Sequence, residues 1–305
     1  MSVLDYLRML RPLNCLMSSM AVLIGGLLVI GWNFQHISGY TPLYPALAAV
    51  FLIAGAGNVI NDYFDVESDK INRPKRPIPS GKVSRRGALA FSVGLFIIGI
   101  LIAGLINWIT FVIAVVNSVA LILYSSHLQN KILLGNLSIG YLTGSTFLFG
   151  GAAMNNLVLP IWLALLAGLS TISREIVKDM EDVEGDRKGF LKRLTSKFKD
   201  SVSAPIAERF GVTTKGVQMR INKGRALFLA AFTLLLSVAL SPLPYLFGIL
   251  GFNYLIAVIP TDLLFLIAIL QINRINGKSN YKSIQRTIKL GMFLGLIAFI
   301  IGVFF

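Results

Sequence analysis

The sequence has few charged residues and one cysteine, and each of these scarcities excludes a class of protein. Only 14% of its 305 residues are Asp, Glu, Lys or Arg, whereas 55% are hydrophobic, and the mean hydropathy is +0.74. A soluble core cannot bury that much apolar surface, so we predict an integral membrane protein. The single cysteine, Cys15, excludes an intrachain disulfide and a thiolate metal cluster, and its apolar surroundings favour a small buried side chain.

Four stretches contain no charged residue, and each is long enough for a hairpin of two membrane-spanning helices. A spanning helix needs about 20 residues. Polar breaks divide each stretch where the hairpin return belongs, and one further apolar helix runs from about 284 to Phe305. The predicted fold is therefore an all-α integral membrane protein with nine transmembrane helices. The uncharged stretches are 12–61, 87–130, 132–173 and 226–261.

All 28 Lys and Arg residues lie before the first span or in loops on the same side of the predicted bundle. The positive-inside rule places these segments and the N-terminus in the cytoplasm, and nine spans place the C-terminus on the opposite side of the cell membrane. A net charge of +14 is also typical of nucleic-acid-binding proteins, but charge confined to membrane-flanking loops is better explained by orientation and anionic lipid headgroups.

We expect one transmembrane domain over residues 1–305, in contact with membrane lipids, and neither a nucleic-acid partner nor an obligate protein partner. Its cytoplasmic loops are expected at about 62–86, 125–134, 174–225 and 272–286.

Two acidic motifs lie at the cytoplasmic ends of the second and sixth predicted spans. Spacings of three and four put each trio of carboxylates on one helix face. Six carboxylates that share a pocket need cations between them, and oxygen ligands favour Mg²⁺, which usually keeps phosphate oxygens in its shell. We therefore predict a Mg²⁺-bound diphosphate, and the alternative is a pair of solvated acidic helix ends. The motifs read Asn58-x-x-Asn61-Asp62-x-x-Asp65-x-x-x-Asp69 and Asp179-x-x-Asp182-x-x-x-Asp186.

Basic side chains flank both motifs and are suited to bind phosphate. Arg174 and Lys178 lie one turn apart on the acidic face of the sixth span. Arg73 follows the first motif in a proline-containing loop that ends the helix. For each of these cations, the alternative is ordinary membrane-flanking charge.

A short cytoplasmic loop between the fourth and fifth spans is dense in polar residues. Lys131 is its only charge and is expected to contact a phosphate, while Tyr124 is expected to line the reacting end of a chamber. For His127, a solvated position at the membrane interface is favoured over catalysis. The polar residues are Tyr124, Ser125, Ser126, His127, Gln129, Asn130, Lys131 and Asn136.

Asp262 is the only charged residue deep within a predicted span, where an ionisable group is costly unless it faces a polar interior. One interpretation is a functional role in the chamber. The others are that Asp262 caps a helix restarted after Pro260 or accepts a hydrogen bond from a neighbouring span.

The segments 58–74 and 174–186 resemble the two signatures of the UbiA superfamily of intramembrane prenyltransferases, and the resemblance covers nearly the whole chain. It implies a bundle around a central chamber, with Mg²⁺-bound polyprenyl diphosphate at its cytoplasmic mouth, from which the polyprenyl group passes to an acceptor. The implied metal ligands are Asp62, Asp65, Asp69, Asp179, Asp182 and Asp186. The resemblance also implies that Asn58 and Asn61 belong to the diphosphate site. With the cations predicted above, the expected diphosphate ligands are Asn58, Asn61, Arg73, Lys131, Arg174 and Lys178.

Within the superfamily, residues 58–84 and 174–179 are most similar to the archaeal digeranylgeranylglyceryl phosphate synthases. These enzymes transfer a geranylgeranyl group from its diphosphate to the free hydroxyl of geranylgeranylglyceryl phosphate during synthesis of membrane ether lipids. A phosphate on the acceptor matches the surplus of basic residues, and its expected ligands are Lys75, Arg76 and Arg11. Asn14, Tyr124 and Asp262 are expected to line the chamber.

Two other functions share parts of this pattern. An aromatic prenyltransferase of quinone, haem or chlorin pathways would have the same metal site and a different acceptor. A cation transporter is disfavoured because coupling sites usually lie near the bilayer midplane, where only Asp262 is expected.

A departure from the family pattern is the long basic segment from Arg187 to Arg225. Its first part is predicted to form an amphipathic helix on the membrane surface. The segment either caps the chamber or contacts lipid as a mobile insert.

Overall fold

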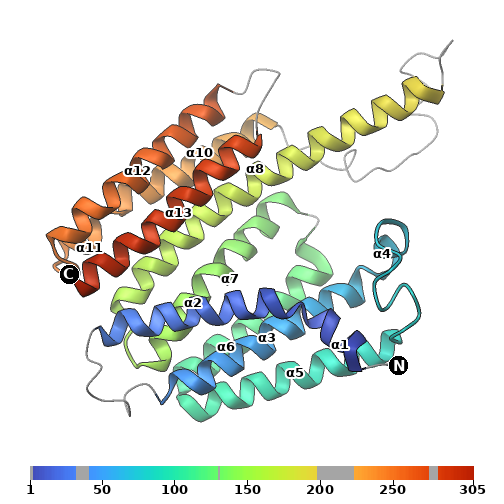
Figure 1. Cartoon of the computed structure of the whole chain (residues 1–305), viewed down its shortest axis with the longest axis horizontal. Helices are drawn as coiled ribbons and strands as arrows, with labels where there is room; N and C mark the ends of the chain where they lie inside the picture. The colour runs from blue at the N-terminus through green and yellow to red at the C-terminus, as the bar shows by residue number, and fades with distance from the viewer. Residues whose placement is uncertain (1–2, 32–40, 130, 198–222, 275–280) are drawn as a thin grey trace.

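The computed structural model describes residues 3–31, 41–129, 131–197, 223–274 and 281–305, with the backbone alone at 132 and from 183 to 197. Within these ranges the chain is helical and contains no strand, so the predicted all-α class is confirmed (Figure 1). The first half comprises α1 (Val3–Leu10), α2 (Pro12–Ile30), α3 (Leu43–Phe64), α4 (Val66–Asn72), α5 (Arg85–Ile106), α6 (Trp108–Leu123), the π-helical turn η2 (Tyr124–Leu128) and α7 (Ile132–Ala153). The second half comprises α8 (Val158–Lys197), α10 (Lys223–Leu240), α11 (Leu243–Leu246), α12 (Phe252–Asn273) and α13 (Tyr281–Phe304).

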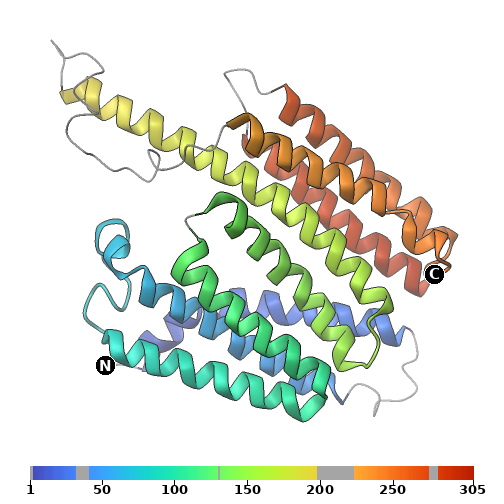
Figure 2. The ribbon, with the colours of Figure 1, turned by 180° about the vertical axis from the view of Figure 1, so that it is seen from behind.

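The long helices pack side by side in one bundle (Figures 1 and 2). In the first half, α5 packs on α3, α3 on α2, and α2 on α7. Helix α7 then packs along α8, and α10 and α13 pack against other parts of α8, with α12 between them. Because α8 contacts both groups, it is the element that joins the two halves.

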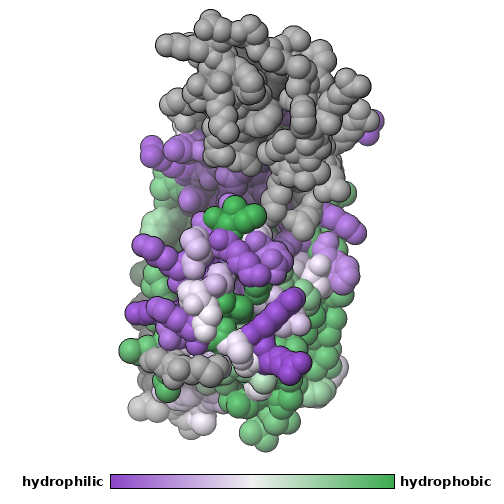
Figure 3. All heavy atoms as spheres, turned by 90° about the vertical axis from the view of Figure 1, so that its right-hand side faces the viewer, coloured by the Kyte–Doolittle hydropathy of each residue, from purple (hydrophilic) through white to green (hydrophobic). Residues whose placement is uncertain are grey.

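Eight of the described helices are long and apolar enough to cross a membrane, which fits the predicted class of multi-spanning protein. Helix α7, which is not among these eight, also has 22 residues and carries no Asp, Glu, Lys or Arg. The number of nine spans therefore stays a prediction. Figure 3 looks onto the end of the bundle near α1 and α4, where polar side chains gather between apolar flanks.

Helix α8 extends well beyond the other helices (Figure 1). The first part of the segment after Asp186 was expected to be helical, and its backbone is helical to Lys197 as a continuation of α8, which has 40 residues. Residues 198–222, which hold the rest of the long basic segment, lie outside the described chain. The predicted cap or lipid-contacting insert concerns these residues and therefore lies outside the described chain.

Glycines bring α2 and α7 into backbone contact. A Cβ atom added at Gly150 of α7 would lie 2.0 Å from the carbonyl oxygen of Val22 in α2. One added at Gly25 of α2 would lie 2.2 Å from the carbonyl oxygen of Phe147. Small residues permit such close packing, which replaces a hydrophobic driving force between helices in lipid.

Candidate active site

The first acidic motif lies at the end of α3, and two of its aspartates are buried in ion pairs. Asp62 Oδ1 accepts a hydrogen bond from Arg11 Nη2 at 2.6 Å and another from Arg76 Nη1 at 3.0 Å. Arg76 Nη1 also donates to Asp69 Oδ2 at 2.5 Å. Arg11 and Arg76, predicted as ligands of an acceptor phosphate, thus contact two predicted metal ligands.

Arg11 is aimed at Asp62 by a break between α1 and α2. Its backbone is left-handed, with φ 53° and ψ 67°, which is uncommon for a residue other than glycine. The carbonyl of Leu10 beside the break accepts hydrogen bonds from Asn58 Nδ2 at 2.8 Å and from Cys15 Sγ at 3.1 Å. The amide of Asn58, predicted to bind diphosphate, therefore holds the chain that presents Arg11.

A cleft of about 500 Å³ opens beside Asp62, between α1 and the loop that follows α4. Five cationic residues and one carboxylate line it, so the cleft favours an anion. All three predicted acceptor-phosphate ligands are among them, as is Arg73, which was predicted to bind diphosphate. Sequence reasoning gave Arg8 no role beyond that of a basic residue flanking the first span. The charged lining residues are Arg8, Arg11, Asp62, Arg73, Lys75 and Arg76.

Asp65 has different partners from Asp62 and Asp69. It lies at the bend between α3 and α4 and is half-buried. Its Oδ1 accepts a hydrogen bond from Gln129 Nε2 at 2.7 Å, and Gln129 Oε1 accepts one from Asn61 Nδ2 at 3.0 Å. Gln129 directly follows η2, and π-helical turns are frequent at functional sites. Asn61 thus acts on the acidic motif through Gln129.

The second acidic motif lies on α8 and repeats this pattern. Asp179 is half-buried, and its Oδ2 accepts a hydrogen bond at 2.9 Å from Nδ2 of Asn136, a buried residue of α7. Glu175, one turn earlier, is buried and accepts hydrogen bonds from Arg174 and Lys178. Asp182 is exposed, and the side chain of Asp186 lies outside the described residues.

Tyr124, the first residue of η2, connects the two motifs. The residue is half-buried and lies within electrostatic range of the carboxylates of Asp65, Glu175 and Asp179. The ends of α3 and α8 therefore face the same space. Among the side chains that the structure describes, no three acidic, histidine or cysteine groups lie close enough to hold a metal ion by themselves.

Three further predicted residues have other surroundings. Asn14 is exposed in the first turn of α2, and Lys131 is exposed where α7 begins. Asp262 accepts a hydrogen bond from Ser241 at 2.7 Å, so the expected bond from a neighbouring segment is present.

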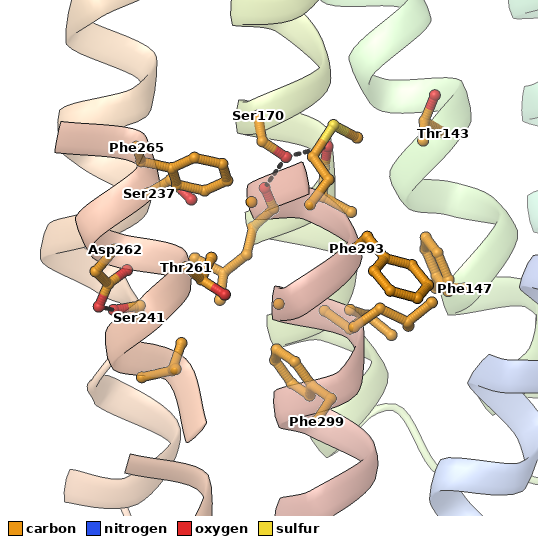
Figure 4. A pocket seen from close by; sticks show the side chains of 18 residues that line it. Thr143, Phe147, Ser170, Ser237, Ser241, Thr261, Asp262, Phe265, Phe293 and Phe299 are labelled. Atoms are coloured by element: carbon orange, nitrogen blue, oxygen red, sulfur yellow. Dashed lines mark hydrogen bonds between the residues drawn. The ribbon is translucent and has the colours of Figure 1, made fainter. Parts of the chain in front are cut away.

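Asp262 lines an apolar pocket of about 270 Å³ between α7, α8, α10, α12 and α13, and no residue of either acidic motif lines it. Figure 4 shows Asp262 and Ser241 on one wall and Phe147 and Phe293 on the opposite wall.

Sequence reasoning noted the polar loop but gave no role to Gln129 or Asn136, and it gave none to Glu175. Gln129 is one of several polar side chains in its loop, and Asn136 follows the apolar residues at the start of α7, so the sequence alone marks neither as the partner of an aspartate. Glu175 had a usable signal, because a carboxylate four residues before Asp179 lies on the same helix face.

Comparisons with known proteins agree with this geometry. The model of the UbiA prenyltransferase family matches residues 18–297. A digeranylgeranylglyceryl phosphate synthase of Methanococcus maripaludis is 41% identical over 305 residues, which cover 100% of both chains.

Among solved structures, one that concerns digeranylgeranylglyceryl phosphate synthase in membranes is 37% identical, with a TM-score of 0.80 over 98% of this chain and 97% of the other. A UbiA homologue of Archaeoglobus fulgidus bound to GPP and Mg²⁺ is 20% identical, with a TM-score of 0.62 over 97% of this chain and 99% of that one, and shares the fold. The chain belongs to the UbiA prenyltransferase family of multi-pass membrane enzymes.

Proposed function

We propose that this protein transfers a geranylgeranyl group from geranylgeranyl diphosphate to the free hydroxyl of geranylgeranylglyceryl phosphate, with Mg²⁺, on the cytoplasmic side of the membrane. The basic cleft beside Asp62 carries this proposal, because it offers an acceptor phosphate its own site next to the first acidic motif. Full-length similarity to synthases of this type supports the same substrates. An aromatic acceptor without an anionic group gives the cleft no role.

Asp65 and Asp179 fit a magnesium ion that also binds the diphosphate. Each is held by an amide rather than by a cation, so neither charge is neutralised by its hydrogen-bond partner. Carboxylate oxygens suit Mg²⁺, which usually binds one or two carboxylates and completes its shell with water and phosphate oxygens. When bound there, Mg²⁺ would offset the charge that collects on the departing diphosphate.

The chain's own residues then have separate tasks. Arg174 and Lys178, which lie on α8, bind the diphosphate of the donor. The basic cleft orients the phosphate of the acceptor. The allylic carbon–oxygen bond of the donor breaks, and its electron pair leaves with the diphosphate. The acceptor hydroxyl oxygen forms the new ether bond and releases its proton. The apolar pocket along α8 is suited to receive hydrocarbon of the substrates.

The decisive assay offers the purified protein labelled geranylgeranyl diphosphate and Mg²⁺ with either geranylgeranylglyceryl phosphate or an aromatic acid. We expect label in the ether lipid alone, detected after extraction by mass spectrometry. Label in the aromatic acid alone would contradict the proposed acceptor, and transfer to neither would contradict prenyl transfer itself.

The cleft is tested by removing two of its exposed cations together, as Arg73→Gln/Lys75→Gln. We expect the KM for the phosphate acceptor to rise by about tenfold, equivalent to about 1.4 kcal/mol, with the KM for the donor nearly unchanged. Lys70→Gln is the matched control, because Lys70 pairs with Glu67 on α4 and does not line the cleft. An unchanged acceptor KM in the double variant would remove the cleft from the proposal.

A further inference from the structure

Glu175 is a buried carboxylate at the site to which the proposed reaction gives no direct task. Its side chain is 7% exposed, and each of its carboxylate oxygens accepts a hydrogen bond from a different cation. Arg174 donates through Nη2 to Oε1, and Lys178 donates through Nζ to Oε2 at 3.0 Å. These two side chains are 29% and 53% exposed, so they extend from the buried carboxylate toward accessible space.

Stability alone is a poor reason for this cluster. A buried ion pair contributes little net stability, because the cost of desolvating the charges offsets their attraction. A carboxylate beside a diphosphate site also repels the ligand, so its presence calls for a compensating gain. Lys and Arg side chains lose much rotamer freedom when a ligand fixes them. A carboxylate that holds them beforehand lowers the entropy lost on binding.

The remaining donors of the two cations are suited to bind an anion. Guanidinium and ammonium groups each carry several N–H donors, so one bond to Glu175 leaves others for phosphate oxygens. Arg174 Nε has no hydrogen-bond partner among the described residues. The Tyr124 hydroxyl interacts electrostatically with both Glu175 and Asp179, so the cluster faces the same space as the second acidic motif.

We propose that Glu175 is a positioning residue, which holds Arg174 and Lys178 in the orientation that binds the diphosphate of the prenyl donor. This inference rests on the proposed prenyl transfer and adds to it the residue that organises the cations. Glu175 acts through the two cations and does not touch the substrate. Its removal therefore weakens donor binding, and has no further effect once the cations are gone.

The test measures binding of labelled geranylgeranyl diphosphate to the full-length protein with Mg²⁺ and no acceptor, so that no turnover occurs. The Kd is compared for wild type, Glu175→Gln, Arg174→Gln/Lys178→Gln and the triple variant. Glutamine at 174 and 178 keeps hydrogen-bond donors near the buried carboxylate while removing both positive charges. Glu181→Gln is the matched control, because Glu181 lies on the same helix and binds Gln285 of α13 instead.

We expect Glu175→Gln to raise the Kd by about tenfold, to change kcat at saturating donor by less than about threefold, and to leave the melting temperature near that of Glu181→Gln. In the Arg174→Gln/Lys178→Gln background, we expect the same substitution to change the Kd by less than about twofold.

An equal loss of affinity in both backgrounds overturns the proposal, as does a fall in kcat of about a hundredfold with an unchanged Kd, which would indicate direct catalysis. If Glu175→Gln does not fold, Glu175→Asp decides the question, because a shorter carboxylate must still weaken binding. Failure of the wild type to bind or transfer the donor contradicts the proposed function instead.

Discussion

Asp62 and Asp65 stand three residues apart in one motif, yet the structure gives them different environments. Asp62 is buried against two guanidinium groups, whereas Asp65 is half-buried and accepts an amide hydrogen bond. Two arginines offset the charge of Asp62, while Gln129 leaves the charge of Asp65 available to a cation. The two residues therefore contribute differently to stability and to the proposed chemistry.

Asp65→Asn should lower turnover with little loss of stability. Asparagine can still accept the hydrogen bond from Gln129, so the local structure persists while the charge is lost. We expect kcat to fall by about a hundredfold or more, with a melting temperature within about 2 °C of wild type. Steady-state kinetics and thermal unfolding in detergent measure the two effects. Wild-type turnover in this variant would exclude Asp65 as a metal ligand.

Asp62→Asn should instead lower stability, because the substitution breaks ion pairs with Arg11 and Arg76 that are largely withdrawn from water. We expect a loss of about 1–3 kcal/mol, since the freed guanidinium groups remain partly exposed. The measurement is the midpoint of thermal or denaturant unfolding, compared with Asp65→Asn as the control. Equal stability of the two variants would show that the ion pairs contribute nothing to the fold.

At the scale of the element, backbone contact between α2 and α7 positions the first half of the bundle. Gly150 is the residue at which this contact least tolerates a side chain. A Cβ atom there meets a backbone carbonyl oxygen of α2, which cannot rotate away as a side chain can. Helix α7 also supplies Asn136 to Asp179. A displacement of α7 therefore disturbs the second acidic motif as well as the packing.

Gly150→Ala should destabilise the protein by about 1–3 kcal/mol, the usual range for overpacking a close contact. Gly94→Ala on α5 is the matched control, because nothing lies within 4 Å of a Cβ at that position. Alanine there should leave stability unchanged or raise it by up to about 1 kcal/mol, since glycine is the weaker helix former. Thermal unfolding of both variants tests this, and equal melting temperatures would contradict the close contact.

For the whole molecule, the proposed orientation places both acidic motifs and the basic cleft on the cytoplasmic side. The chain is suited to a labelling test because Cys15 is its only cysteine and is buried. In a Cys15→Ser background, Ser80→Cys reports on the loop after α4, and Asn156→Cys reports on the turn between α7 and α8. Both positions are exposed.

A membrane-impermeant thiol reagent added to intact cells should label Asn156→Cys and leave Ser80→Cys unlabelled until the membrane is opened. The reverse pattern would indicate the opposite orientation. Labelling of both cysteine variants in intact cells would show that the membrane does not separate the two positions.

The sequence by itself determined the fold class and the two acidic motifs. Both depend on local properties: the absence of charge over spanning lengths, and spacings of three and four that repeat on a helix face. It also identified four of the five cations of the basic cleft, although it assigned Arg73 to the diphosphate and Lys75, Arg76 and Arg11 to the acceptor phosphate.

Only the tertiary structure decided which side chains partner the aspartates. Gln129 meets Asp65 across 64 positions of sequence, Asn136 meets Asp179 across 43, and Arg11 meets Asp62 across 51. Such contacts depend on how helices pack and on a left-handed break at Arg11, and neither leaves a periodic signal in the sequence. An aspartate paired with an arginine and one held by an amide look identical in a motif. Only these long-range partners therefore show which carboxylates keep a charge available to a metal.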